Sequence, residues 1–453
     1  MTDLDTLLRA TLAAAAGEVE PTDPVALARD LHRARASRRR AHRARAVALA
    51  AAAVLLVVGA SVLVRSAVSG DGDQARDRVQ AGPPSAPTAG PTAPAPGGEG
   101  PPAAPTSFAG LGPGWHSLDP GPVPPALGAG LAWTGAELVI VLPDGSAWAH
   151  RPDRGTWRTL APAPLAGGDA VELAWTGTEV VAVARGSRTT SAAWDPGTGT
   201  WRDLGAVPVA PELAAALGSL GIVSAGAAPA LVWSGERLFD MERLAALDPT
   251  TGQWEPLALP ADLVAFTSLL YTNAVWDGTE VLAVNWIGSG LAWDPSGTSF
   301  REVAPAATEL GSTTGSVPFT RAVAVGGEVV LVSGLDDPGS GRGTGGVAAL
   351  DARTGRWRRL PDVPGVNADV GCPYLVEAVA GQVVVQRCDQ PSTMVLRDGR
   401  WQPNGTPALD QQCCGGRWQA AGDALVVWSS DTDTVNNDRA PYVEAAVWVP
   451  EDR

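Results

Sequence analysis

The stretch Trp175-Thr176-Gly177 ends one apolar segment, turns the chain and leads into a second apolar segment, and equivalents of it recur to the C-terminus. Its glycine is matched by Gly135, Gly235, Gly278, Gly326, Gly381 and Gly422. The spacings between these seven glycines are 42, 58, 43, 48, 55 and 41 residues. A period near 40–50 residues with four short strands per repeat is typical of a β-propeller. The sequence therefore predicts an all-β fold of seven blades.

The second half of each repeat has its own signature. Trp194-Asp195-Pro196 is followed by Trp201, seven positions after Trp194, and the same spacing joins Leu247 to Trp254 and Trp293 to Phe300. Asp, Pro and Gly between the two positions favour a tight turn. An aromatic at one fixed place per repeat is expected to fill the gap between neighbouring blades.

The pattern of an apolar residue, a six-residue gap and a Trp resembles the repeat of kelch-type propellers, and the resemblance covers residues 112–453. The resemblance implies a seven-bladed kelch-like β-propeller. Residues 418–449 supply only three strands for the last repeat, whereas the segment Gly114-Trp115-His116-Ser117-Leu118 has the form of an isolated fourth strand. We expect this segment to pair with the last three strands, because closure removes the exposed sheet edge.

Residues 46–64 form an uncharged run of nineteen residues, nearly all Ala, Val and Leu. At 1.5 Å per residue such a helix spans about 30 Å, the thickness of the hydrocarbon core of a bilayer. Seven arginines precede the run from Arg33 to Arg45, and only Arg65 follows closely. The positive-inside rule then predicts a single-pass membrane protein with a cytoplasmic N-terminus and an extracytoplasmic propeller. The alternative is a cleaved signal peptide, which a 45-residue leader fits poorly.

Residues 65–111 are rich in Pro, Gly and Ala and predict a disordered stalk. Residues 1–45 predict two short helices, the second running into the arginine cluster. A short helical segment before one membrane span and an outer domain resembles bacterial membrane-anchored anti-sigma proteins. The resemblance implies a cytoplasmic sigma factor as a partner; the alternative is that the arginines only set topology.

The net charge is −15, and residues 1–46 carry nine Arg against six acidic residues, which leaves −18 for the rest. An acidic outer domain argues against nucleic acid as a ligand, because phosphate binding needs clustered basic residues. The four cysteines, an even number outside the cytoplasm, predict disulfides. They are Cys372, Cys388, Cys413 and Cys414, with a metal site as the alternative. We expect each of the adjacent pair to bond one of the other two.

Long connections fall between the second and third strands of a repeat and between successive repeats, at 209–229, 306–320, 334–345 and 429–443. Both kinds emerge on one face of a propeller, and variable loops on a rigid scaffold commonly carry binding sites. The candidate ligand-binding residues on that face are Asp336, Asp337, Arg342, Asp431, Asp433, Asn436, Asn437, Asp438 and Arg439. The alternative is that these are solvated loops.

No nucleophile motif, phosphate loop, metal pattern or cofactor fingerprint is present, so we expect no cofactor, no bound metal and no catalytic residues. The function predicted is that of a membrane-anchored binding or scaffold protein. It would recognise an extracytoplasmic protein, glycan or small ligand through one propeller face and signal inward. The alternative is an extracytoplasmic hydrolase that uses a pair of carboxylates in the channel.

Overall fold

The computed structural model describes residues 108, 110–186, 188–214, 231–258, 273–284, 290–304, 306, 321–332, 346–364, 374–387, 392–407, 409, 416–431 and 441–451. All belong to the unit Gly98–Arg453. The predicted cytoplasmic segment (1–45), the membrane span (46–64) and the predicted stalk up to residue 107 lie outside them. At the end of the predicted stalk (65–111), Phe108 is buried in an apolar cluster of the propeller and Leu111 packs against that cluster, so Phe108 and Leu111 do not belong to a disordered stalk. Within the described ranges, no helix has the length and apolar character needed to cross a membrane.

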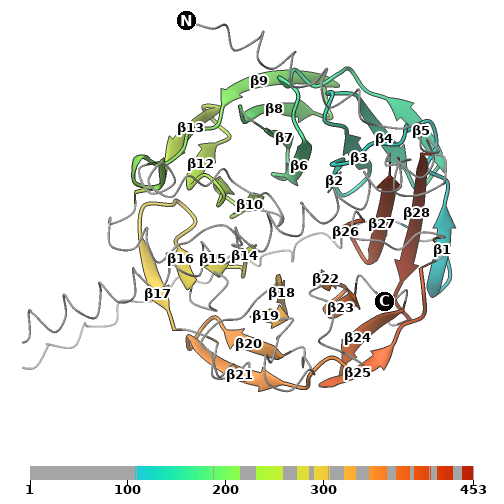
Figure 1. Ribbon diagram of the computed structural model, residues 1–453, viewed down its shortest axis with the longest axis vertical. Coiled ribbons are helices and arrows are strands. Elements are labelled where there is room, and N and C mark those ends of the chain that lie inside the picture. The colour runs from blue at the N-terminus through green and yellow to red at the C-terminus, as the bar shows by residue number, and fades with distance from the viewer. Residues whose placement is uncertain are drawn as a thin grey trace, which may run out of the picture. The chain divides into compact units, whose positions relative to one another are not determined.

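Seven four-stranded antiparallel sheets make up the described part of the chain, and successive sheets contact one another through their first strands around a common centre (Figure 1). Blade 1 is β2 (Gly130–Trp133), β3 (Leu138–Val141), β4 (Ala147–Arg151) and β5 (Thr156–Thr159). Blade 2 is β6 (Ala170–Trp175), β7 (Val180–Arg185), β8 (Thr190–Asp195) and β9 (Thr200–Ala206). Blade 3 is β10 (Leu231–Trp233), β11 (Leu238–Asp240), β12 (Ala245–Asp248) and β13 (Gln253–Pro256).

Blades 4 to 7 continue the ring. Blade 4 is β14 (Asn273–Trp276), β15 (Val281–Val284), β16 (Gly290–Trp293) and β17 (Phe300–Val303). Blade 5 is β18 (Arg321–Val325), β19 (Glu328–Val332), β20 (Val347–Asp351) and β21 (Arg356–Leu360). Blade 6 is β22 (Tyr374–Val379), β23 (Gln382–Arg387), β24 (Thr393–Arg397) and β25 (Arg400–Pro403). Blade 7 is β26 (Arg417–Ala421), β27 (Ala424–Asp431), β28 (Tyr442–Val449) and β1 (Gly114–Leu118).

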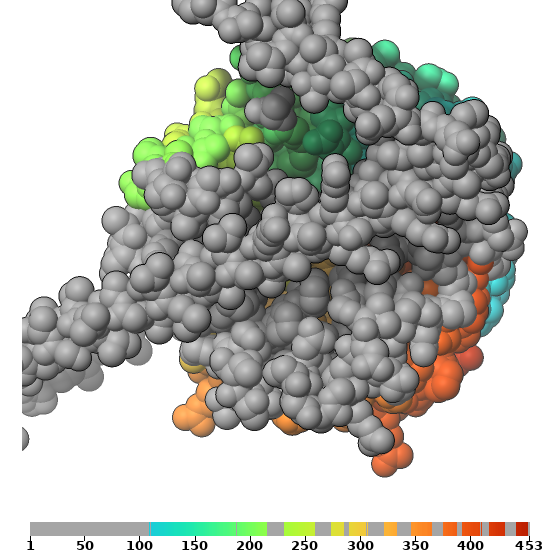
Figure 2. Space-filling model, viewed as in Figure 1, coloured from blue at the N-terminus to red at the C-terminus, as the bar shows by residue number. Residues whose placement is uncertain are grey.

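The ring closes as the sequence predicts. β1 pairs antiparallel with β28, with Trp115 opposite Trp448 and Leu118 opposite Ala445. In the space-filling view the cyan atoms of the N-terminal part of the ring lie beside the orange-red C-terminal part (Figure 2). The N-terminal strand thus supplies the outermost strand of blade 7 and covers the sheet edge that β28 would otherwise expose.

In blades 1 to 4 the turn between the first two strands is capped by the side chain of its first residue. The Thr134 hydroxyl accepts a hydrogen bond from the Glu137 backbone N–H at 3.0 Å, and Ser234 and Asp277 do the same in blades 3 and 4 at 3.0 and 2.8 Å. The glycine that follows has positive φ, for example 91° at Gly135. A side chain is strained in that conformation, which explains why the repeat keeps glycine there.

The aromatic of each outermost strand packs between two blades, as predicted. Trp115, Trp157, Trp201, Trp254, Phe300, Trp357 and Trp401 each contact a separate apolar cluster that spans one blade boundary. Most also donate a hydrogen bond across that boundary. The Trp357 Nε1 atom, for instance, donates to the Ala304 carbonyl just after β17 at 2.7 Å, and Trp115 donates to the Asn404 carbonyl at 2.9 Å. These tryptophans therefore link neighbouring blades by hydrogen bonds as well as by apolar packing.

Replacing Trp357 with phenylalanine should destabilise the propeller by about 0.5–1 kcal/mol, because the ring contacts persist while one interblade hydrogen bond is lost. Chemical denaturation of the full chain would measure the change. Arg356→Ala, at an exposed neighbour on the same strand, is the control and should be nearly neutral. Equal effects of the two changes on stability would show that the hydrogen bond from the Trp357 indole N–H does not stabilise the contact between blades 4 and 5.

Candidate functional site at the channel mouth

Polar side chains gather where the first strands of several blades begin, at the inner edge of the ring. Glu172, Asn273, Arg321 and Arg417 each lie four residues before the residue that opens the turn to the second strand, so strand pairing gives all four the same register position. The equivalent residue in blade 1 is Gly130 and in blade 6 Leu375. The remaining residues of these strands are largely apolar. Four of the blades therefore contribute a polar group at one end of the central channel, and we call these four residues the polar ring.

This end carries the connections between second and third strands and between blades, and we call it the loop face. The short turns lie on the opposite, turn face. We define the mouth cluster as the polar ring together with the charged residues beside it in blades 2 and 3. Its members are Glu172, Arg185, Asp240, Glu242, Arg243, Asn273, Arg321 and Arg417.

Arg185, the last residue of β7, joins blades 2 and 3. Its Nη2 lies 2.6 Å from Glu172 on β6, its Nη1 2.6 Å from Asp240 on β11, and its Nε 3.3 Å from Glu242. The side chain is 9% exposed and that of Asp240 is 0% exposed. Burial alone would lower the pKa of Arg185, but Asp240, Glu172 and Glu242 outweigh it and the pKa is raised. Arg185 is thus a permanent cation that holds three carboxylates.

Backbone hydrogen bonds hold one of the carboxylates, and Arg243 adds a second link between blades 3 and 2. Asp240 accepts hydrogen bonds from the backbone N–H groups of Glu242 and Arg243, both at 3.1 Å. Arg243 reaches back to blade 2, donating to the Thr189 hydroxyl and to the Val207 carbonyl. Burial raises the pKa of Glu242, and the Arg185 charge opposes that shift. This half of the channel mouth is held rigidly across one blade boundary.

The other half of the mouth presents two arginines from blades that are not adjacent. The Arg321 Nη1 atom donates to the Asn273 side-chain oxygen at 3.4 Å, which links blade 5 to blade 4. Burial and, to a lesser degree, the charge of Arg417 in blade 7 lower the pKa of Arg321 to about 10, while the charge of Glu172 in blade 2 opposes the shift. Charges from blades 2 and 7 therefore act on Arg321 in blade 5, and the strands that carry these residues, β6, β26 and β18, lie around the centre of the ring (Figure 1). We call Arg321 and Arg417 the channel arginines.

Glu377 lies one step deeper on β22, two residues beyond the register position of the ring. It is half-buried, and burial raises its pKa from 4.5 to about 7, with a hydrogen bond from the Ala378 backbone N–H opposing the shift. No arginine contributes to this shift among the described groups. Near neutral pH the channel therefore contains a carboxyl group that is readily protonated and deprotonated.

Glu377 should make stability depend on pH. A carboxyl whose pKa is raised in the folded state stabilises the fold fully below its unfolded pKa of 4.5, and that contribution is lost as the pH rises through about 7. Glu377→Gln should match the wild type near pH 4.5 and exceed its stability by up to about 3 kcal/mol above pH 8. Urea unfolding at pH 5 and pH 8 would measure this, with Glu302→Gln on the outer strand β17 as the control. A pH-independent difference would contradict the raised pKa.

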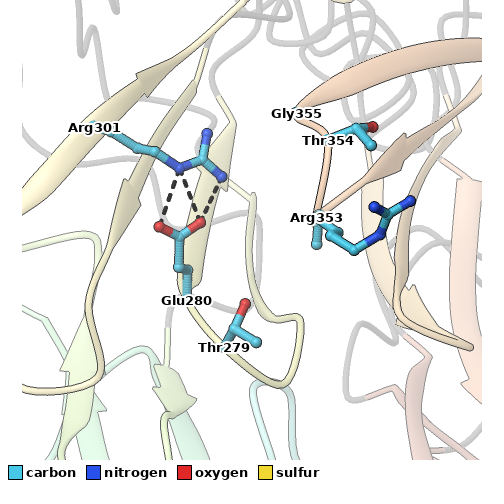
Figure 3. A pocket seen from close by; sticks show the side chains of 7 residues that line it. Thr279, Glu280, Arg301, Arg353, Thr354 and Gly355 are labelled. Carbon is cyan, nitrogen blue, oxygen red and sulfur yellow. Dashed lines mark hydrogen bonds and ion pairs between the residues drawn. The ribbon is translucent and has the colours of Figure 1, made fainter. Parts of the chain in front are cut away.

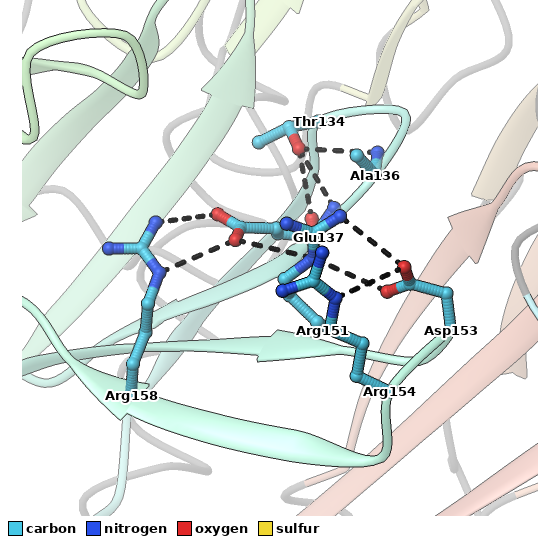
Figure 4. A network of polar contacts seen from close by, with 7 residues as sticks. All are labelled: Thr134, Ala136, Glu137, Arg151, Asp153, Arg154 and Arg158. Atoms are coloured by element: carbon cyan, nitrogen blue, oxygen red, sulfur yellow. Dashed lines mark hydrogen bonds and ion pairs between the residues drawn. The ribbon is translucent and has the colours of Figure 1, made fainter.

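The turn face has a different character. In blade 1 Arg158 pairs with Glu137 at 2.7 Å, with Arg151, Asp153 and Arg154 nearby (Figure 4). The same pair recurs in other blades, and in blade 3 both charges are exchanged, with Arg237 joined to Glu255 at 2.7 Å. The simultaneous exchange preserves the ion pair. Such a pattern indicates a role inside each blade rather than in ligand binding, although exposed pairs add little stability.

A pocket of about 450 Å³ lies between blades 4 and 5 on the turn face (Figure 3). Its lining includes the paired Glu280 and Arg301 on one side and Arg353 and Thr354 on the other. The Arg353 side chain is 86% exposed. The charges of this pocket are either already paired or fully solvated, so it offers less for recognition than the mouth cluster.

Most residues predicted as ligand-binding fall outside the described part of the chain. Asp431 ends β27 on the loop face, and its side chain is not described. Asp336, Asp337, Arg342, Asp433, Asn436, Asn437, Asp438 and Arg439 lie beyond the described ranges, as do Cys372, Cys388, Cys413 and Cys414. Their predicted roles stay predictions. Within the described ranges, no group of three or more His, Cys, Asp or Glu side chains could hold a metal ion.

The mouth cluster is on the predicted face, but the sequence reasoning did not name its residues. A usable signal was present: Glu172, Asn273, Arg321 and Arg417 are charged or amide residues at one fixed distance before the turn, in strands that are otherwise apolar. Comparing the repeats position by position would have found them. Arg185 and Asp240 end the second strands of blades 2 and 3, where they pair with Ala170 and Leu231 of the first strands.

No protein-family model matches the chain, and no curated protein sequence matches it. Solved structures with a related fold include an oligogalacturonate lyase from Vibrio parahaemolyticus, with a TM-score of 0.48 and 12% identity over 75% of this chain and 98% of that one. The structure of YjhT has a TM-score of 0.38 and 13% identity over 71% of this chain and 98% of that one. Both likenesses are weak, and the seven-bladed propeller is established here by the strand pairing itself.

Proposed function

We propose that this chain is a membrane-anchored binding protein whose propeller stands outside the cytoplasm and recognises a polar envelope component or small ligand at the loop face of its channel. The observation that carries the proposal is the mouth cluster. Charged and amide side chains are concentrated at one register position of strands that are otherwise apolar. Partly burying a charged group costs free energy unless the group is paired with an opposite charge or binds a ligand.

The location follows from the sequence. The uncharged run at residues 46–64 and the arginines before it support a single membrane span with the propeller outside. The spacing of the aromatic repeat supports a kelch-like ancestry for the ring. Four cysteines in the last third of the chain fit an oxidising compartment, where two disulfides would form near blade 6.

The direct test is binding by the full chain reconstituted in lipid nanodiscs. A panel of neutral and charged envelope sugars, amino acids and peptidoglycan fragments would be titrated by calorimetry. We expect saturable binding of at least one compound, weakened by Asn273→Ala in the mouth cluster and unaffected by Arg353→Gln on the turn face. If no compound binds, or if the turn-face change abolishes binding, the proposed site is wrong.

Inward signalling through a sigma factor is the further part of this proposal, supported by the helical, arginine-rich segment before the membrane span. Deleting residues 1–40 should change transcription of a set of genes in the native host while the propeller melts at the same temperature. RNA sequencing and thermal melting measure the two effects. If transcription does not change, the signalling proposal is wrong and the arginines only set the membrane topology.

A second candidate is a hydrolase, favoured by Glu377. A carboxyl group with a pKa of about 7 in a polar channel has the properties of a general acid or base. A hydrolase would release product from one of the bound compounds, and Glu377→Gln would abolish release without preventing binding. Chromatography of the incubated panel distinguishes the two candidates: unchanged compounds favour the binding protein.

A further inference from the structure

We propose that the channel arginines, Arg321 and Arg417, bind the carboxylate of a small acidic ligand, such as an acidic sugar, in the channel mouth. This inference rests on the proposed function and names its ligand class. The two side chains come from β18 and β26, which are separated by one blade and share the polar-ring position. An anion on the channel axis could therefore contact both.

The chemistry of the two residues suits a carboxylate. Guanidinium groups present a planar set of donors that matches a carboxylate in two parallel hydrogen bonds. Asn273, 5% exposed, accepts from the Arg321 Nη1 atom at 3.4 Å and so orients that side chain. Burial and the nearby charge of Arg417 lower the pKa of Arg321, and an anion bound between the two arginines would offset both unfavourable effects.

The charge of the mouth cluster points to an anion with a single charge. Among the described residues of this cluster, four arginines exceed three carboxylates by one positive charge. Arg185 holds all three of those carboxylates within 3.3 Å, on the side of blades 2 and 3. One carboxylate ligand would balance the excess, whereas a phosphate dianion would leave a net negative charge in a partly buried site. Desolvated charge is tolerated best when it is balanced.

Glu377 adds a dependence on pH. The charged groups on strands packed against β22 are Arg321 on β18, Arg387 on β23, Arg417 on β26 and Asp431 on β27. The side chains of Arg387 and Asp431 are not described. Deprotonation of Glu377 adds a negative charge two residues along β22 from the polar-ring position, and this charge opposes an anion in the channel mouth. Binding of a carboxylate should therefore weaken as the pH rises through about 7.

The test compares sugars that differ by one carboxylate, using the full chain in nanodiscs and calorimetry at pH 6 and pH 8.5. The pairs are N-acetylmuramic acid with N-acetylglucosamine, and glucuronate with glucose; inorganic phosphate is a third arm. We expect the acid of at least one pair to bind more tightly than its neutral partner. Arg321→Gln and Arg417→Gln should each weaken that binding by about tenfold to hundredfold, since a charge-assisted hydrogen bond is lost.

Arg353→Gln is the matched control and should leave affinity unchanged, and Glu377→Gln should remove the pH dependence. Circular dichroism and melting temperatures check that each variant is folded, and Arg321→Lys, which keeps the charge, should retain part of the affinity. Equal affinity for acid and neutral sugars, or preferential binding of phosphate, overturns this inference while leaving a binding propeller in place. Absence of binding by every compound overturns the proposed function as well.

Discussion

Replacing Arg185 with alanine is expected to destabilise the propeller by about 3–5 kcal/mol, the usual cost of removing one partner from a buried ion pair. Its guanidinium lies within 3.3 Å of Glu172, Asp240 and Glu242, and the Asp240 side chain has no solvent exposure. The alanine variant leaves these carboxylates buried beside one another at the boundary of blades 2 and 3. Denaturant unfolding of the full chain, monitored by tryptophan fluorescence, would measure the loss.

Two further observations separate lost charge from lost packing. Arg185→Met keeps the volume of the side chain, so Arg185→Met combined with Asp240→Asn should recover part of the loss that Arg185→Met causes alone. The deficit of the alanine variant should also be larger at pH 8 than at pH 5. Burial already raises the pKa of Glu242 and Arg185 opposes that shift, so without Arg185 the folded state binds protons more readily and gains stability as the pH falls. A deficit independent of pH would indicate lost packing instead.

The architecture could be predicted because it depends on local, repeated chemistry. Gly135 and its equivalents have positive φ, Thr134 caps the turn through its own hydroxyl, and Trp157 or its equivalent packs at each blade boundary. The glycine and the aromatic recur in every blade and the cap recurs in blades 1 to 4, so each requirement can be read as a fixed position of the repeat. Even the closing strand was recognisable, because Trp115 and Leu118 repeat the spacing of the other outermost strands.

Unless the repeats are compared position by position, the sequence predicts the candidate site only as a face, and even that comparison does not predict the contacts between blades. Arg185 meets Asp240 across 55 residues of sequence, and Arg321 is influenced by Arg417 from a blade two places away. Such contacts depend on how blades are placed around the axis, and nothing in the spacing of a single repeat encodes them. Loop residues are readily chosen as binding-site candidates because they are polar and variable in length. Glu172 and Asn273 are single polar residues inside apolar strands and are therefore easily missed.

Loss of the closing strand should have the largest effect on the fold. Replacing residues 114–118 with five Gly and Ser residues of the same total length is expected to cost at least about 5 kcal/mol, a large part of the stability of a typical domain. Trp115 packs in the cluster between blades 6 and 7 and donates to the Asn404 carbonyl, while Leu118 packs against the cluster between blades 7 and 1. The replacement would also leave β28 as an exposed edge, a template for pairing with another chain.

Differential scanning calorimetry and size-exclusion chromatography of the full chain would measure both consequences, a lower melting temperature and association through β28. Ser117→Ala is the matched control, because Ser117 is the exposed residue of β1 and its change should be nearly neutral. Since each blade contacts the next around a closed ring, loosening blade 7 should weaken the whole domain in one transition. A separate early transition, with six blades melting at the original temperature, would instead show that the ring remains stable when open.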